Sequence, residues 1–137
     1  MNHRIGGRKF GLPSDQRRAL LKSLVRALFT YQTIKTTETR AKDVRSIAEK
    51  MISNARVDTL HARRLANRYL TDETLVRHLF TQIAPEFMGV SGGFTRAVKI
   101  GQRRGDAATI VQLSLTTDRE LGLPVIPEKT GQPSRVR

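Results

Sequence analysis

The sequence predicts an α/β (α+β) domain in which about four helices pack on a small three-stranded mixed sheet. Apolar residues recur at helical spacing in four segments between residues 14 and 85. Three shorter runs are rich in β-branched residues, and a Gly-bounded loop joins the last two. A length of 137 residues suits one domain with tails. We therefore expect a basic N-terminal arm (1–13), a globular domain (14–117) and a flexible, disordered C-terminal tail (118–137).

The charge balance predicts a polyanionic partner. The chain has 25 Lys and Arg residues against 12 Asp and Glu residues, a net charge of +13. Such an excess repels itself unless a polyanion compensates it; nucleic acid is the commonest candidate and an anionic membrane surface the second. No apolar run approaches the ~20 residues of a membrane span, and no secretory signal follows the first basic residues. Cysteine is absent, which excludes a disulfide framework and fits a reducing, cytoplasmic setting.

The first 13 residues show no apolar periodicity. Their glycines let the backbone approach another surface closely. We expect this arm to be disordered alone and to become ordered on nucleic acid. The alternative is that Ile5, Phe10 and Leu12 dock on the protein core and secure the first helix. The basic residues of the arm are His3, Arg4, Arg8 and Lys9.

The first helix is expected to begin at Ser14 as its N-cap, with Asp15 in the first turn, where the helix dipole favours an acid. Its apolar face is predicted to comprise Leu21, Leu24, Val25, Leu28 and Tyr31. Arg18, Lys22 and Arg26 are four residues apart and line one flank. This basic flank predicts phosphate contacts beside the buried face, although long cations also serve simply to solvate a helix.

A β-branched cluster predicts a short strand over Gln32–Thr36. Thr37 is then expected to cap a second helix, with Glu38 in its first turn. The inward positions of this helix are Ala41, Val44, Ala48, Met51, Ile52 and Ala55. Its early cations are Arg40, Lys42 and Arg45. Because the dipole disfavours cations at a helix start, these three hint at a bound anion.

Two further helices are expected. The third begins at Asp58 or Thr59, and the fourth at Asp72 and Glu73. Their inward residues are Leu60, Leu65 and Ala66 in the third helix and Leu75, Val76, Leu79, Phe80 and Ile83 in the fourth. Pro85 is expected to end the fourth helix, because proline removes a backbone donor and clashes with the preceding turn.

The last part of the domain predicts a hairpin. After a loop over Glu86–Ser91 come a strand over Phe94–Ile100, a turn over Gly101–Asp106 and a strand over Thr109–Leu115. The first strand carries two cations and the tip two more: Arg96, Lys99, Arg103 and Arg104. Planar guanidinium groups match phosphate oxygens, so the paired arginines of the tip favour nucleic-acid contact over a merely solvated loop.

The sequence offers no parts for catalysis. His3, His61 and His78 lie far apart, without the spacing of metal ligands. The phosphate-binding loop and the serine-nucleophile motif are both absent. We therefore expect no catalytic residue, no cofactor, no metal and no small-molecule substrate.

Several ordered motifs resemble one family. They are His3-Arg4 in the arm, Ile34-Lys35-Thr36-Thr37, Ala41-Lys42, Arg63-Arg64-Leu65-Ala66, Gly92-Gly93-Phe94-Thr95-Arg96 and Arg103-Arg104-Gly105-Asp106. Together they resemble bacterial ribosomal large-subunit protein seventeen, from Met1 to about Leu115. Phe94 stands where that family usually has Tyr, Ala97 replaces a usual Ile and Asn2 a usual Arg, and the last strand lacks the family's Pro-Met-Ala start.

The resemblance implies a non-catalytic protein of the large ribosomal subunit in the cytoplasm. It implies binding to large-subunit (23S) ribosomal RNA near the nascent-chain exit, beside large-subunit proteins twenty-two and thirty-two. Two alternatives remain open: a DNA-binding architectural protein and, less favoured, an RNA-modifying enzyme. The candidate RNA-binding residues are His3, Arg4, Arg8, Lys9, Arg17, Arg18, Lys22, Arg26, Lys35, Arg40, Lys42, Arg45, Arg63, Arg64, Arg96, Lys99, Arg103 and Arg104.

Overall fold

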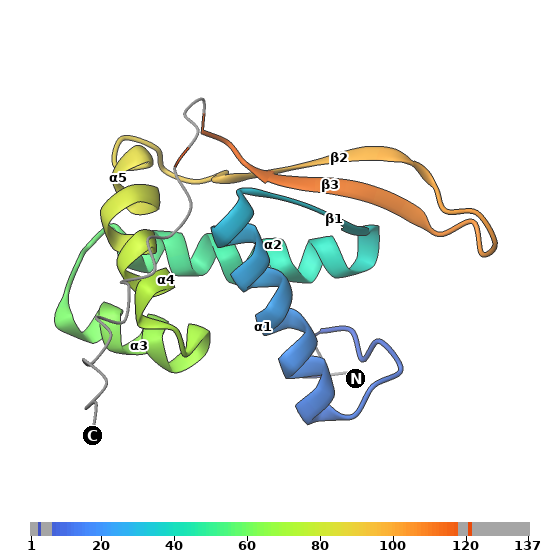
Figure 1. Ribbon diagram of the computed structural model, residues 1–137, viewed down its shortest axis with the longest axis horizontal. Coiled ribbons are helices and arrows are strands. Elements are labelled where there is room, and N and C mark those ends of the chain that lie inside the picture. Colours follow the sequence, from blue (N-terminus) through green and yellow to red (C-terminus); the bar gives the residue numbers. More distant parts are fainter. Residues whose placement is uncertain (1–2, 4–6, 118–120, 122–137) are drawn as a thin grey trace, which may run out of the picture.

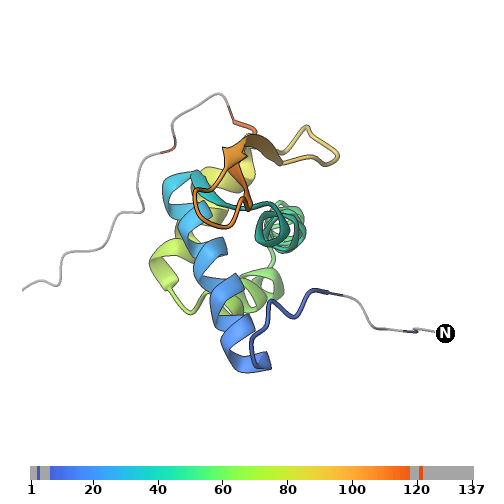
Figure 2. The same ribbon diagram turned by 90° about the vertical axis from the view of Figure 1, so that its right-hand side faces the viewer.

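The computed structural model describes His3, residues 7–117 and Leu121. A three-stranded sheet forms one layer and the helices lie on one of its faces, as Figures 1 and 2 show from two sides. In chain order the elements are α1 (Ser14–Tyr31), β1 (Thr33–Thr37), α2 (Glu38–Ala55), α3 (Leu60–Leu70), α4 (Glu73–His78), the π-helical turn η1 (Leu79–Ile83), α5 (Ala84–Glu86), β2 (Thr95–Gln102) and β3 (Thr109–Leu115). The expected α+β class, with helices packed on a small three-stranded sheet, is confirmed.

The sheet is antiparallel throughout, with strand order β1-β3-β2, and the expectation of a mixed sheet was wrong. The predicted hairpin is β2 and β3, and β1 joins the free edge of β3. The β-branched composition of β1 indicates a strand. It carries no information on the direction of β1 relative to β3, which follows some 70 residues later.

Each strand of the sheet presents one row of side chains to the helices. On β3 this row is Val111, Leu113 and Leu115, all buried. Leu113 lies opposite Ile34 of β1 and Ala97 of β2. The row meets a core cluster whose largest fully buried side chains on the helices include Phe29, Leu28, Ile52, Leu70, Leu75, Leu79 and Ile83. The alternation of β3 therefore separates a covered inner face from an open outer face.

The helix starts follow the predicted residues with one correction. Ser14 is the first residue of α1 rather than its cap; Pro13 is the N-cap, and no side chain caps that end. Thr37 caps α2 without a side-chain hydrogen bond. The Thr59 hydroxyl accepts the N–H of the third residue of α3 at 3.1 Å, and Asp72 accepts the N–H groups of the second and third residues of α4.

Three apolar residues expected to face inward are exposed: Tyr31 (66%), Leu60 (64%) and Leu65 (43%). The buried face of α1 is centred near Val25, and Tyr31 lies about 120° away from it at 100° per residue. On α3 the inward stripe is Ala62, Ala66 and Leu70, so Leu60 and Leu65 fall outside it. The five residues expected to face inward on the fourth helix are all buried.

Pro85 does not end the fourth helix. The backbone widens into the π turn η1 and then continues through α5, where Pro85 occupies an early position. The wider turn accommodates a residue that has no backbone N–H and would clash with an ordinary α-helical turn. The expected loop from residue 86 was also partly wrong, because Glu86 is helical and Phe87 is buried, with its ring centroid 5.1 Å from that of Phe94.

The strand limits differ from the expected ones by one or two residues, except for β3, which matches. Gln32 is not in β1; it adopts the left-handed conformation that ends α1, with φ of 62°. At the other end of the sheet, β2 continues through Gly101 to Gln102. An irregularity between Lys99 and Gly101 adds one residue to β2 and keeps it paired beyond the predicted end.

Parts of both termini contact the domain. The Gln32 side-chain amide donates a hydrogen bond to the Leu121 carbonyl, and Leu121 is buried against the core cluster. This residue falls in the segment that we expected to be an unpacked tail; the remainder of that prediction concerns residues 118–120 and 122–137, which lie outside the described residues. In the arm, Phe10 and Leu12 are half-buried, and Ile5 is not among the described residues. Whether the arm becomes ordered only on RNA stays a prediction.

Candidate nucleic-acid interface

The outer face of the sheet is uncovered and carries cations and hydrogen-bonding groups. In its two central cross-strand rows, Ser114 lies between Thr33 and Arg96, and Gln112 lies between Lys35 and Val98. We call these six residues the open face. Both of its cations are exposed, and neither forms an ion pair within the described residues. Hydroxyl, amide and cationic groups on an accessible sheet match the phosphates and 2′-hydroxyls by which folded RNA is recognised.

The hairpin extends past the start of α2, and its tip is free of helical cover (Figure 1). Arg103 forms a bidentate pair with Asp106, with Nε–Oδ1 and Nη2–Oδ2 distances of 3.0 and 2.5 Å. Asp106 also accepts the N–H of Ala108 at 3.3 Å. The hydrogen bond from Arg103, followed by that from Ala108, lowers the pKa of Asp106 to about 2. Gly105, at φ of 104°, supplies a turn conformation that most residues avoid.

The two tip arginines therefore have different roles. Arg103 shapes the loop through Asp106, whereas Arg104 is exposed and has no ion pair within the described residues. A guanidinium already held by a carboxylate must exchange that partner before it can hold a phosphate. Arg104 is thus the more available of the two for RNA.

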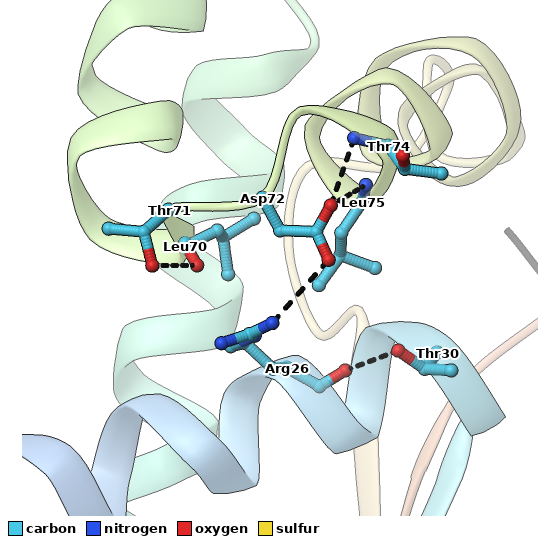
Figure 3. Close-up of polar contacts among 7 residues, drawn as sticks. All are labelled: Arg26, Thr30, Leu70, Thr71, Asp72, Thr74 and Leu75. Carbon is cyan, nitrogen blue, oxygen red and sulfur yellow. Dashed lines mark hydrogen bonds and ion pairs between the residues drawn. The ribbon is translucent and has the colours of Figure 1, made fainter. Parts of the chain in front are cut away.

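Arg26 links two helices, as Figure 3 shows. Its Nη2 lies 3.4 Å from Oδ2 of Asp72, whose other oxygen caps α4. The Arg26 carbonyl accepts a hydrogen bond from the Thr30 hydroxyl at 2.8 Å. Arg18 and Lys22, on the same basic flank, have no ion pair within the described residues. The basic flank therefore has two parts. Arg26 joins α1 to α4, whereas Arg18 and Lys22 remain available to an external anion.

Several other candidate cations are paired. Arg8 of the arm pairs with Asp43 of α2. Arg63 forms a bidentate pair with Asp58 at 2.6 and 3.0 Å and lies 5.1 Å from the Phe80 ring centroid. The hydrogen bond with Asp58 raises the pKa of Arg63 and lowers that of its partner. Such cations contribute to the surface potential, but each already contacts protein.

The candidate residues thus fall into two sets. Those ion-paired within the described residues are Arg8, Arg26, Lys42, Arg45, Arg63, Lys99 and Arg103. Those described without an ion pair are His3, Lys9, Arg17, Arg18, Lys22, Lys35, Arg40, Arg64, Arg96 and Arg104, of which Arg17 donates to the Ser14 hydroxyl at 3.5 Å. Arg4 lies outside the described residues. The structure does not bring all of them to one surface; Arg96 of the open face and Arg104 of the tip belong to the same hairpin.

Sequence reasoning omitted three exposed cations, Lys50, Arg68 and Arg77, which have no ion pair in the described part of the chain. Arg68 follows Arg64 by four residues on α3, so helical spacing could have indicated it. Arg56, also omitted, has a structural role: it donates to the Val90 carbonyl, and its guanidinium lies 5.4 Å from the Phe94 ring centroid.

Nothing in the described part of the chain groups three potential metal ligands together. His78 is buried, its Nε2 has no hydrogen-bond partner, and burial lowers the pKa of its imidazole. Among the described helices, none is both long and apolar enough to cross a membrane.

The comparisons with known proteins agree with one another. The family model described as "Ribosomal protein L17" matches residues 20–116. A protein of Thermoanaerobacter sp. (strain X514) is 52% identical over 111 residues, which cover 81% of this chain and 99% of that protein. One from Clostridium beijerinckii is 53% identical over 110 residues, covering 80% and 97%. Both relatives are named "Large ribosomal subunit protein bL17".

Proposed function

The chain belongs to the ribosomal protein L17 family, and from this premise we propose that it is a structural constituent of the large ribosomal subunit whose open face and hairpin tip bind 23S ribosomal RNA. A protein of this family is a component of a particle and not an enzyme. The resemblance seen in the sequence and the family found by comparison are the same.

The observation that carries the RNA-binding proposal is the contrast between the two faces of one sheet. The inner row of β3 is buried beneath the helices, whereas the outer row of the sheet offers Lys35, Arg96, Gln112 and Ser114 to solvent. Arg104 extends the same cationic character to the hairpin tip. A broad surface of cations and polar groups suits recognition of RNA by shape and backbone. A groove-reading DNA-binding protein would instead present a dedicated recognition element.

We further propose a position near the nascent-chain exit, beside large-subunit proteins twenty-two and thirty-two. The support for this position is the place in the large subunit that the resemblance to the family implies. The chain contains no cysteine, so a single introduced cysteine provides a unique attachment point for a cross-linker.

Sedimentation with large subunits in moderate salt tests the general proposal. The protein should co-sediment with the large subunit, and purified 23S RNA should bind it more tightly than duplex DNA of equal phosphate content. Cross-linking from Arg104→Cys on assembled subunits tests the position, with Glu73→Cys on α4 as the matched site. Equal affinity for duplex DNA would support the architectural alternative, and cross-links only to proteins remote from the exit would refute the position.

A further inference from the structure

A small cavity of about 140 Å³ lies between the first turns of α2 and the hairpin. Its lining combines three cations with one carboxylate and three apolar side chains: Lys42, Arg45 and Glu38 of α2, Lys99 of β2, and Ala41, Ala97 and Val111. Lys99 reaches it because this residue belongs to the inner row of β2, opposite Val111. The lining thus carries an excess of two positive charges, and it lies at the end of α2 where the helix dipole favours an anion.

Glu38 lies between two lysines from different elements. Its Oε1 is 3.0 Å from Lys42 Nζ and 3.7 Å from Lys99 Nζ. The hydrogen bond from Lys42, and then the charges of both lysines, hold the pKa of Glu38 below its usual range. The two lysine side chains are 58% and 70% exposed, so an anion can approach them from solvent. One carboxylate therefore keeps two exposed cations close together.

The second carboxylate of this region is held more firmly. Glu49 accepts from Arg45 Nε at 3.2 Å and also from the buried hydroxyl of Thr95 at 2.8 Å. Within the described residues, the Glu38 carboxylate by contrast has only the two exposed lysines as partners. Exposed pairs of that kind contribute little to stability and are readily exchanged. Glu38 is accordingly the carboxylate that an incoming anion can displace.

We propose that this cavity binds one phosphate group of the RNA backbone, which replaces Glu38 between Lys42 and Lys99. Arg45 stays paired with Glu49. A phosphate offers more acceptor oxygens than a carboxylate, and its entry releases condensed counterions from the RNA. In the absence of RNA, the Glu38 carboxylate occupies the anion position and keeps the two lysines together. This inference rests on the proposed RNA binding of the protein and assigns one contact within it.

The opposing account is that Glu38 only ties the hairpin to α2. The two accounts predict different RNA affinities for Glu38→Gln. If Glu38 competes with phosphate, the variant should bind purified 23S RNA more tightly; if Glu38 is only a tie, the hairpin loosens and affinity falls or does not change. Glu73→Gln on α4 is the matched control, because it changes the net charge equally and lies outside the cavity.

We expect Glu38→Gln to bind 23S RNA roughly two- to fivefold more tightly than Glu73→Gln, the range that loss of an exposed ion pair allows. Lys99→Ala should lower the salt dependence of binding by about one phosphate contact, a slope change of ~0.7–0.9, whereas Lys50→Ala on α2 should leave it unchanged. In the Lys99→Ala background, the gain from Glu38→Gln should disappear. Inorganic phosphate without RNA should bind wild type and Glu38→Gln only weakly.

Equal affinities of the two glutamine variants, or an unchanged salt slope for Lys99→Ala, would overturn the phosphate site while leaving RNA binding by the protein intact. Tight binding of inorganic phosphate alone would overturn its assignment to the RNA backbone. If wild type itself failed to bind 23S RNA, the proposed function would fall instead. Melting temperatures of all variants within a few degrees of wild type show that each is folded.

Discussion

The helical body and the β2–β3 hairpin belong to one fold but differ in how far their side chains are buried. In the body, apolar faces of α1, α2, α4 and η1 are buried together. Along β2 only Thr95 is buried, and Val98 and Ile100 are 52% and 54% exposed. Figure 1 shows the hairpin running beyond the helices. The body is therefore stabilised by its own core, whereas most side chains of β2 remain exposed to solvent.

The largest effect is expected from the buried row of β3, which packs against the helical body. Leu113→Ala should reduce the free energy of unfolding by about 2–5 kcal/mol, because it leaves a cavity where β3 meets the core. Chemical denaturation of the isolated protein measures this loss. Val98→Ala, on the outer side of the same hairpin, is the matched control and should cost well under ~1 kcal/mol. Equal losses at the two positions would show that the hairpin is not divided into a structural and an open face.

A middle-sized effect is expected where α1 meets α4. Asp72→Ala removes the cap of α4 and the ion pair with Arg26, and should cost about 0.5–2 kcal/mol of unfolding free energy. Asp72→Asn keeps a capping oxygen but loses the charge, so thermal denaturation should show a smaller loss. Should the asparagine variant be as unstable as the alanine one, the ion pair and not the cap would be the main contribution.

A smaller effect is expected from pH. Burial lowers the pKa of His78 in the folded protein below its usual 6.5, so the unfolded chain binds the proton first as pH falls. The free energy of unfolding contributed by this residue should be fully present above pH ~6.5 and should decline below it, until the folded pKa is passed. His78→Gln should flatten the curve between about pH 7 and 5, and His61→Gln, at an exposed position, should not. A curve that is the same in wild type and His78→Gln would contradict the assignment.

Sequence reasoning recovered the parts of the fold that local pattern encodes. The buried residues of α4 and η1 followed from their spacing. The helix starts were predicted at Asp58 or Thr59 and at Asp72 and Glu73, and the structure shows Thr59 and Asp72 as the N-caps. It failed where information is not local. The direction of β1, the π turn that accommodates Pro85 and the exposure of Tyr31 all depend on how distant elements pack.

The candidate site shows the same limit. Composition and spacing identified cations in the arm, helices and hairpin, but three of the seven ion pairs within the described residues join residues that are distant in sequence. Arg26 and Asp72 are 46 residues apart, and Arg8 and Asp43 are 35 apart. Only pairs such as Arg103 with Asp106, three residues apart, could have been recognised beforehand. The sequence thus indicated which kind of surface to expect but not which cations remain available to it.

The salt dependence of 23S RNA binding tests the central claim most directly. A variant with Lys35, Arg96 and Arg104 changed to Ala removes three cations of the open face and tip; its control, with Lys50, Arg68 and Arg77 changed to Ala, alters net charge equally on the helices. We predict that the first lowers the slope of log affinity against log salt by roughly 2 to 3, at ~0.7–0.9 per lost contact, with an unchanged melting temperature, and that the second lowers it by much less. Equal slopes for the two variants, or a larger loss in the helical one, would contradict the account.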